Sequence, residues 1–224
     1  MSTYFFSDAC ADYRSLREKG YPEKATLKLV GDRYRLTQVQ RNSMFRGIVV
    51  DALALPRKKK IVLPSDVKGS SIGIDWYNVL ITVESYLRGS PIFICDDGMV
   101  RDSSETHGSF RRSALTERAL REIVSELRLM SPSRVDIFLD APIAFSGLMA
   151  EEVRAAVGQI PCTAEVTVAQ SADYPLKGYE GIVATSDSVV LDSAARILDL
   201  PRSVLQRGFR FIPPLLRDLH SSSP

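Results

Sequence analysis

The sequence predicts an α/β fold, in which helices cover both faces of a mostly parallel sheet, preceded by a small all-helical domain. From about residue 71 onwards, short apolar runs alternate with longer segments whose apolar residues recur at helical spacing, which is typical of strands joined by helices. Before residue 48, capping residues and glycines divide the chain into pieces of helix length. Hydrophobic residues make up 45% of the 224 residues and charged residues 25%, so the chain can bury a core without disulfides.

The composition argues against several classes of protein. No apolar run approaches the roughly 18 residues that a membrane span needs. The charged segment from Met1 to Gly20 does not have the form of a secretory signal, and both observations favour a cytoplasmic protein. The three cysteines are widely spaced and form no Cys-x-x-Cys pair, which argues against a disulfide framework and a zinc ribbon.

A basic helical domain is expected over residues 1–47. Ser7 can cap a first helix that ends near Gly20. Pro22 suits the first turn of a second helix, and Gly31 is a natural end for it. A third helix then completes the domain.

The third helix is expected over residues 38–46, because Thr37 and Gln40 have the spacing of a capping box. Beyond it, two short apolar runs flank the sequence Pro56-Arg57-Lys58-Lys59-Lys60. Strands bounded by turn residues have this appearance, so residues 48–70 are predicted to be a linker or a hairpin.

The α/β domain is expected over residues 71–207, followed by a C-terminal tail over residues 208–224. Its predicted strands cover residues 72–74, 91–95, 134–139, 165–168 and 181–184, and its predicted helices cover residues 79–87, 115–129 and 146–157, with one more within 189–198. Ligands in such sheets bind beyond the carboxyl ends of the strands.

Charge divides the chain unevenly. Residues 1–65 hold thirteen Lys and Arg against six Asp and Glu, whereas residues 66–224 hold sixteen against twenty-one. A basic segment attracts phosphate backbones, and Arg beside Tyr suits contact with phosphates and stacked bases. The alternative is an ordinary solvated surface. The candidate nucleic-acid-binding residues are Arg33, Arg35, Arg41, Lys58, Lys59, Lys60, Arg111 and Arg112.

Acidic residues follow four of the predicted strands. They are Asp75 after the first, Asp96 and Asp97 after the second, Asp140 after the third and Asp187 after the last. Gathered carboxylates repel one another unless a cation neutralises them, and Mg²⁺ or Mn²⁺ is the usual ion. Such ions can activate water for phosphodiester hydrolysis. The alternative is that Asp is common at turns and helix caps, and Asp97-Gly98 has the form of a hairpin turn.

Several stretches resemble PIN-like nucleases. The run Ile72-Gly73-Ile74-Asp75-Trp76-Tyr77-Asn78 resembles their opening strand, and Gly181-Ile182-Val183-Ala184-Thr185-Ser186-Asp187 resembles a later strand. Glu117 sits about where that superfamily places a helix Glu, and Asp140, in Phe138-Leu139-Asp140-Ala141-Pro142, matches the mid-sheet Asp of some branches. The resemblance spans about residues 71–200.

The whole chain also resembles a largely archaeal, uncharacterised family that fuses a small basic helical domain to a PIN-like domain. Its signature stands here as Tyr21-Pro22 and Leu29-Val30-Gly31-Asp32-Arg33-Tyr34-Arg35-Leu36.

These resemblances imply a metal-dependent nuclease, with RNA as the expected substrate. The implied catalytic residues are Asp75, Asp140, Asp187 and Glu117, the implied ligands of Mg²⁺ or Mn²⁺ are Asp75, Asp140 and Asp187, and the supporting residues are Asn78 and Ser186. Asp97 is a further candidate ligand because it follows a predicted strand, although its segment is not a standard feature of PIN-like nucleases. The alternative is a non-catalytic nucleic-acid-binding or adaptor protein on the same scaffold. A Rossmann-type enzyme for small molecules is disfavoured because no glycine fingerprint follows a strand. The sequence is compatible with a homodimer.

Overall fold

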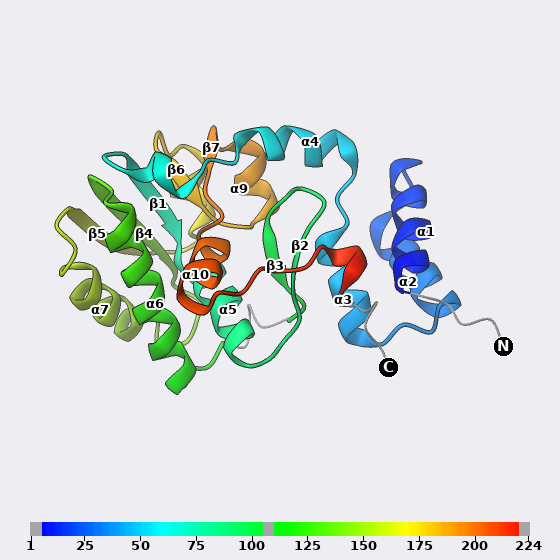
Figure 1. Cartoon of the computed structure of the whole chain (residues 1–224), viewed down its shortest axis with the longest axis horizontal. Helices are drawn as coiled ribbons and strands as arrows, with labels where there is room; N and C mark the ends of the chain where they lie inside the picture. The colour runs from blue at the N-terminus through cyan, green and yellow to red at the C-terminus, as the bar shows by residue number, and fades with distance from the viewer. Residues whose placement is uncertain (1–5, 105–109, 220–224) are drawn as a thin grey trace. The chain divides into compact units, whose positions relative to one another are not determined.

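The computed structural model describes residues 6–104 and 110–219, and these fall into two compact units (Figure 1). The first unit is formed by residues 1–59, 89–105 and 213–224, and the second by residues 60–88 and 106–212. Among the described residues, no helix is both long enough and apolar enough to cross a membrane.

The second unit is built on a five-stranded parallel sheet, which confirms the predicted α/β class. The strands lie in the order β5-β4-β1-β6-β7, and each neighbouring pair is parallel. Because β1 is central and both its neighbours run in the same direction, the carboxyl ends of the strands meet at one edge. The strand bounds are β1 Ser71–Asp75, β4 Arg134–Asp140, β5 Thr163–Ala169, β6 Ile182–Ala184 and β7 Arg196–Ile197.

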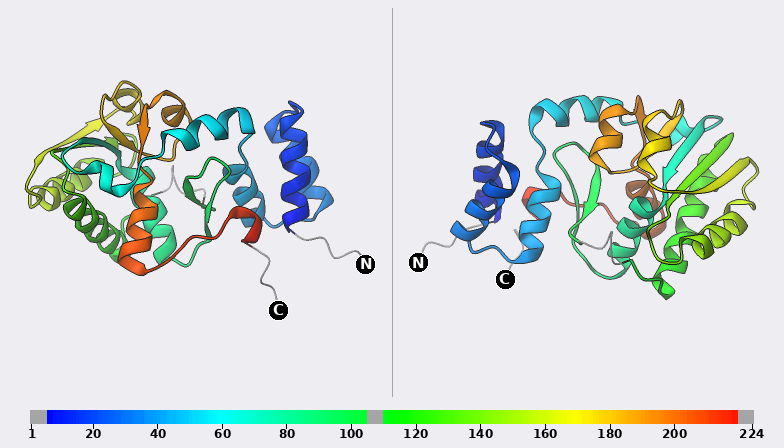
Figure 2. Two further views of the ribbon diagram at one scale, coloured as in Figure 1. Left: turned by 45° about the horizontal axis from the view of Figure 1, so that its top comes forward. Right: turned by 180° about the vertical axis from the view of Figure 1, so that it is seen from behind.

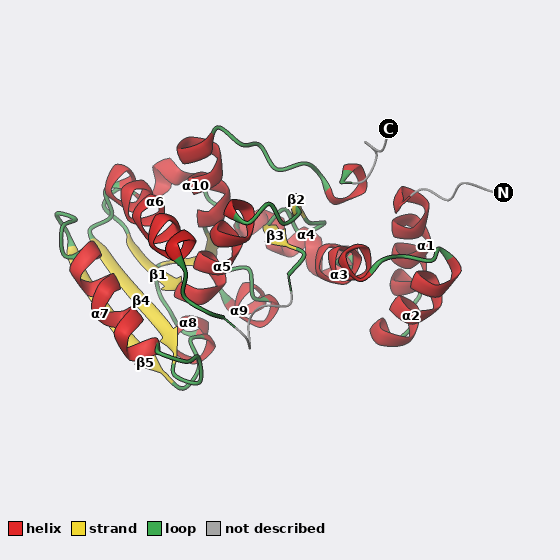
Figure 3. Ribbon diagram, turned by 90° about the horizontal axis from the view of Figure 1, so that it is seen from below, coloured by secondary structure: helices red, strands yellow, loops and turns green. Residues whose placement is uncertain are grey.

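Helices pack on both faces of this sheet. On one face, α6 contacts α5, α7 and α10, while on the other α8 contacts both β1 and α9 (Figure 3). Residues Trp76–Ser85 of α5 are buried throughout, so this helix lies in the core between the sheet and α6. The helix bounds are α5 Trp76–Leu87, α6 Ala114–Met130, α7 Ser146–Val157, α8 Asp173–Lys177, α9 Ser188–Ser193 and α10 Leu200–Phe209, with a short 3-10 helix over Pro64–Val67.

The first unit is mainly helical, and α1 and α2 lie side by side in it (Figure 2). The predicted capping box is confirmed: Gln40 N donates to Thr37 Oγ1, and Thr37 N donates to Gln40 Oε1. The helix bounds are α1 Phe6–Glu18, α2 Glu23–Arg33, α3 Gln38–Gly47 and α4 Asp51–Lys60, with a short 3-10 helix, η3, over Leu216–Asp218.

The sequence predicts that the second helix ends at Gly31, and this prediction is wrong. The helix continues to Arg33, and a Cβ on Gly31 would lie 2.0 Å from Arg41 Nη1. The glycine therefore lets the Arg41 guanidinium group pack close to the α2 backbone and does not form a left-handed turn.

The hairpin predicted within residues 48–70 is wrong, because residues 51–60 form the helix α4. Leu, Ala, Arg and Lys are strong helix formers, and together they outweigh the loss of one backbone donor at Pro56. The helix also buries Ala54 and Arg57, three residues apart and so on one face.

The strand predicted at residues 91–95 belongs to the first unit and not to the parallel sheet. β2 (Ile92–Ile94) pairs antiparallel with β3 (Val100–Asp102) in a two-stranded sheet. The two strands are joined by a turn in which Gly98 has φ of 85°. A turn this short can join β2 to β3 only as antiparallel neighbours, because two consecutive parallel strands need a crossover of a dozen or more residues.

The expected tail over residues 208–224 is divided between both units. Residues up to Phe209 complete α10, whereas Leu216 is buried in the first unit's core with Phe6, Met44 and Phe93. Ile94 N also donates to Pro214 O at 2.8 Å. Residues 220–224 lie outside the described residues.

Candidate functional site

Four aspartates line one pocket at the carboxyl edge of the parallel sheet. The pocket has a volume of about 350 Å³. Three of the four, Asp75, Asp140 and Asp187, were expected from the sequence; the fourth, Asp173, was not. Among the described residues that line the pocket, none is Lys or Arg. The lining residues are Asp75, Asn78, Asp140, Pro142, Ile143, Gln170, Ser171, Asp173 and Asp187.

Asp75 is the buried member of this acidic pocket, with 5% of its surface exposed. It ends β1 and caps α5, accepting a hydrogen bond from Asn78 N at 3.3 Å, while Thr185 Oγ1 donates to its other oxygen at 2.9 Å. Burial raises the pKa of Asp75 to about 7; the Thr185 hydrogen bond opposes this rise, and the charges of Asp140 and Asp173 add to it. The carboxyl group therefore titrates near neutral pH.

Hydrogen bonds join the start of α5 to the segment between β6 and α9. Asn78 Oδ1 accepts from Ser186 N at 2.9 Å and from Ser186 Oγ at 2.5 Å. Thr185 Oγ1, which donates to Asp75, also accepts from Asp187 N at 3.0 Å. The structure thus brings together the two predicted supporting residues, Asn78 and Ser186, and fixes the backbone that carries Asp187.

Asp187 and Asp140 also have local structural roles. Asp187 caps the short helix α9, where its Oδ1 accepts from Val189 N at 2.8 Å and Val190 N at 3.1 Å. Asp140 ends β4, and its Oδ1 accepts from Ala172 N at 2.9 Å. No described residue donates a hydrogen bond to the second oxygen of either carboxylate, so that oxygen can accept other contacts.

Asp173 begins α8, four residues after the end of β5. Burial raises its pKa, and the negative charges of Asp187 and Asp140 raise it further. A sequence signal for this residue existed, because β5 was a predicted strand with no carboxylate assigned to its carboxyl end. A loop separates β5 from Asp173, whereas Asp75 is itself the last residue of β1.

Two predicted site residues lie elsewhere. Glu117 is an exposed residue of α6 whose carboxylate is 3.3 Å from Arg112 Nη2, and it does not line the acidic pocket. Asp97 belongs to the first unit and is fully buried between two arginines. Its two oxygens accept from Arg101 at 2.9 and 2.8 Å and from Arg57 at 3.1 Å.

Asp97 is thus held as a charged structural residue. Burial alone would raise the pKa of Asp97, but the charge and hydrogen bonds of Arg101, together with Arg57, hold it below its ordinary value. Both carboxylate oxygens are already occupied, which leaves little capacity for a metal ion.

Within the part of the chain that the structure describes, the carboxylates do not already form a divalent-ion site. Among the residues described, no group of three or more His, Cys, Asp or Glu side chains is placed to hold a metal ion. The acidic pocket therefore brings the carboxylates to one edge without gathering three of them around one point.

The predicted basic residues differ in what they contact. Arg35 is exposed in the turn before α3, and Lys58 and Lys59 are exposed on α4. Arg33, which is exposed at the end of α2, has its Nε 3.8 Å from Asp12 Oδ2. Arg41 is paired with Asp32 at 3.0 Å, and Lys60 Nζ donates to the carbonyls of Leu191 and Asp192, so these two cations stabilise local structure. Of the other pair, Arg112 lies 2.6 Å from Glu152, while Arg111 is exposed and has no carboxylate partner among the described residues.

Residues 64–203 match a family model described as "Domain of unknown function (DUF5616)". The chain belongs to this family. Residues 5–60 match a second model, described as "Protein of unknown function (DUF434)". All four aspartates of the acidic pocket lie in the DUF5616 part, whereas Arg33, Arg35, Lys58 and Lys59 lie in the DUF434 part.

The chain is also similar to a protein of the archaeon Methanocaldococcus jannaschii, named "Uncharacterized protein MJ0935". The two are 32% identical over 182 residues, which cover 81% of this chain and 86% of that protein. No solved structure gives a significant match.

Proposed function

We propose that this DUF5616 protein is a metal-dependent nuclease of the PIN-like type that hydrolyses phosphodiester bonds in cytoplasmic RNA. The observation that carries the proposal is the acidic pocket, where buried Asp75 shares the carboxyl edge of a parallel sheet with three other aspartates and no basic lining residue. Uncompensated carboxylates in a cleft, with a pKa shifted toward neutrality, are typical of functional sites.

The residues fit a divalent cation by their donor chemistry. Burial is the main cause of the raised pKa values of Asp75 and Asp173, and a cation would offset the repulsion between carboxylates that adds to it. Mg²⁺ commonly uses only one or two carboxylates and keeps several waters, so it does not need three converging side chains. Asp75, Asp140 and Asp187 would hold the ion, one or two of them directly and the rest through its bound waters. When bound, it would polarise water and stabilise the developing negative charge on the phosphate.

The other residues of the pocket would orient the reacting groups. The hydrogen bonds of Thr185 and Ser186 fix Asp75 and Asn78 before substrate arrives, which is the kind of preorganisation that positions a nucleophile. Asp173 is less buried than Asp75, and its raised pKa suits it to accept a proton from the attacking water.

A second candidate function is non-catalytic binding of nucleic acid, as an adaptor. It is favoured by the local roles of Asp140 and Asp187, each of which accepts backbone hydrogen bonds, and by the absence of a preformed three-ligand group among the described residues. Both functions use the exposed basic residues of the first unit.

Cleavage assays distinguish the two functions. The full chain is incubated with single-stranded RNA and DNA oligonucleotides in Mg²⁺ or Mn²⁺, with a chelator as the blank. The nuclease proposal expects products that appear only with metal. Binding of the same oligonucleotides without cleavage under any condition would support the adaptor function instead.

Millimolar Mn²⁺ is expected to raise the melting temperature of the protein by a few degrees at about pH 8. In the metal-free protein the pKa of Asp75 is raised from 3.8 to about 7. The stability associated with its bound proton is therefore fully present below about pH 4 and is lost as pH rises through about 7. Metal would offset that loss, and because protons compete with metal, the stabilisation should shrink below about pH 6.

The control for the melting experiment is a matched pair of neutralising variants. Asp75→Asn should remove most of the response to Mn²⁺ and flatten the pH dependence, whereas Glu180→Gln, an exposed change in the same unit, should leave both unaltered. An equal response in Asp75→Asn and wild type would show that the acidic pocket does not bind the ion.

Neutralising the exposed cations of the first unit is expected to weaken RNA binding. In the variant Arg33→Gln, Arg35→Gln, Lys58→Gln, Lys59→Gln, affinity should fall by at least about tenfold at low salt. The slope of log K against log salt should become shallower by up to about 3, since each lost phosphate contact on a single strand removes roughly 0.7. The measurement is fluorescence anisotropy over a salt series with catalysis blocked by chelator.

Lys68→Gln with Arg196→Gln serves as the matched control, because both residues are exposed cations of the second unit. If the control variant loses as much affinity for each charge removed, the first unit has no special role in binding.

A further inference from the structure

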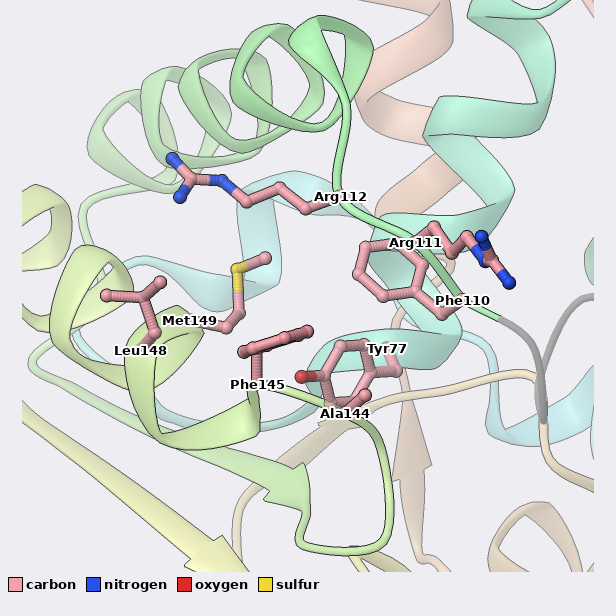
Figure 4. Close-up of a pocket in the computed structure, with 8 residues that line it drawn as sticks. All are labelled: Tyr77, Phe110, Arg111, Arg112, Ala144, Phe145, Leu148 and Met149. Carbon is pink, nitrogen blue, oxygen red and sulfur yellow. The ribbon is translucent and has the colours of Figure 1, made fainter.

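A second pocket lies beside the acidic one and has a different chemistry. Its volume is about 760 Å³, within the range of roughly 300–1,000 Å³ typical of sites for small ligands. Three aromatic rings, Tyr77, Phe110 and Phe145, line it together with Leu148 and Met149, and two arginines stand at its edge (Figure 4). We call it the aromatic pocket.

The aromatic and acidic pockets adjoin each other along two segments of the chain. Tyr77 of the aromatic pocket directly precedes Asn78 of the acidic pocket. After β4, Ile143 lines the acidic pocket while Ala144 and Phe145 line the aromatic one. A ligand that fills both pockets would therefore have a flat apolar group in the aromatic pocket and a second group next to the aspartates of the acidic pocket.

Phe145 has an unusual backbone and an unusual exposure. Its φ is 62°, a left-handed conformation that strains any residue with a bulky side chain, and its side chain is 80% exposed. Glycine or asparagine would satisfy the backbone with less strain at this position before α7. Strained residues cluster at ligand sites, and here the strain holds a phenyl ring at the mouth of the aromatic pocket.

Tyr77 contributes a polar group inside the apolar lining. The residue is fully buried, and its hydroxyl has no hydrogen-bond partner among the described residues. Its ring lies 5.3 Å from that of Phe110, tilted by 59°. In Figure 4 the hydroxyl points toward Phe145. An unpaired buried hydroxyl costs stability, so a ligand that supplies a partner would be favoured.

We propose that the aromatic pocket binds an unstacked nucleobase of a single-stranded nucleic acid whose phosphate lies at the acidic pocket. Base faces stack on aromatic rings regardless of sequence. The Tyr77 hydroxyl adds one hydrogen bond to the base edge, and the exposed Arg111 attracts the adjoining phosphate. A paired base in a duplex could not enter, so the substrate class is single-stranded. The position of the phosphate at the acidic pocket rests on the proposed function, whereas the binding of the base in the aromatic pocket does not.

The test uses the full chain and short RNA oligonucleotides that carry the fluorescent base 2-aminopurine, in chelator, so that no cleavage is needed. Stacking quenches this base. Wild type should quench it on binding, and Phe145→Ala should lower both the quenching and the affinity, the affinity by at least about fivefold. Tyr77→Phe removes only the hydroxyl, so it should keep the quenching but lose most of the preference among the four bases. Leu129→Ala, an exposed apolar change on α6, is the control.

The outcomes separate this inference from the nuclease proposal. If wild type cleaves RNA in a metal-dependent way while quenching and affinity are unchanged in Phe145→Ala, the base-binding proposal is wrong and the nuclease proposal stands. If quenching depends on Phe145 but no cleavage occurs, the base-binding proposal is supported and the nuclease proposal is wrong. If Phe145→Ala alters only self-association in sedimentation, the occupant is a second copy of the chain and the inference is wrong. Because Phe145 is exposed, the melting temperature of its Ala variant should not fall.

Discussion

Cleavage of single-stranded RNA in Mn²⁺ is expected to fall by at least about 100-fold in Asp75→Asn, the usual scale for loss of a positioned catalytic group. The substitution removes one negative charge and keeps the shape of the side chain. The amide oxygen can still accept from Asn78 N, and the amide nitrogen can donate to Thr185 Oγ1, so the fold should persist. The measurement is the single-turnover rate under saturating enzyme, which separates chemistry from binding.

RNA binding is the informative control for this variant. Affinity should persist or increase, because a negative charge that faces phosphate has been removed. Glu180→Gln makes the same chemical change at an exposed position and should cleave at the wild-type rate. A rate for Asp75→Asn within a few-fold of wild type would mean that Asp75 is only the cap of α5.

The second large effect concerns stability of the first unit. Asp97→Asn is expected to lower the free energy of unfolding by roughly 3–5 kcal/mol, because it removes the buried negative charge that pairs with the guanidinium groups of Arg57 and Arg101. The side chains of these arginines are only 4% and 7% exposed. Urea denaturation followed by far-ultraviolet circular dichroism measures the change.

Asp96→Asn is the matched control in the next residue. Asp96 pairs with Arg14, whose side chain is 36% exposed, so Asp96→Asn should lower the free energy of unfolding by less, about 1 kcal/mol. If both variants lower the free energy of unfolding by similar amounts, burial does not determine how much the Arg57–Asp97–Arg101 group contributes to stability.

Much of the second unit could be predicted because its signals are local and periodic. The run from Ile72 to Asp75 is a short apolar strand followed directly by a largely apolar helix, and the strand and the helix both form as expected. Asp140 and Asp187 were found by the same argument, since parallel strands bring their carboxyl ends to one edge. The convergence follows from topology and needs no knowledge of side-chain contacts.

What could not be predicted depends on contacts between distant segments. The helix α4 was missed because Pro56 suggests a turn, and the stabilising contact of Arg57 is with Asp97, forty residues away. Glu117 was placed by resemblance alone, and the pairing with Arg112 that holds it at the surface has no periodic signal. Asp173 was missed because a loop separates it from its strand.

The first unit is assembled from three stretches that are far apart in the sequence, and this affects how the protein is made. Met44 and Gly47 of α3 lie in a core with Phe93 and Leu216, and the Leu216 side chain fills the space where a Cβ on Gly47 would be. During translation, α1 to α3 leave the ribosome long before residues 213–219 are synthesised. Until then part of the apolar surface of these helices lacks its packing partners, while the residues of the parallel sheet emerge and can fold. The boundary at residue 60 suggested by the family models is therefore not a safe place to cut the chain for expression, because the piece before it lacks two of its own core segments.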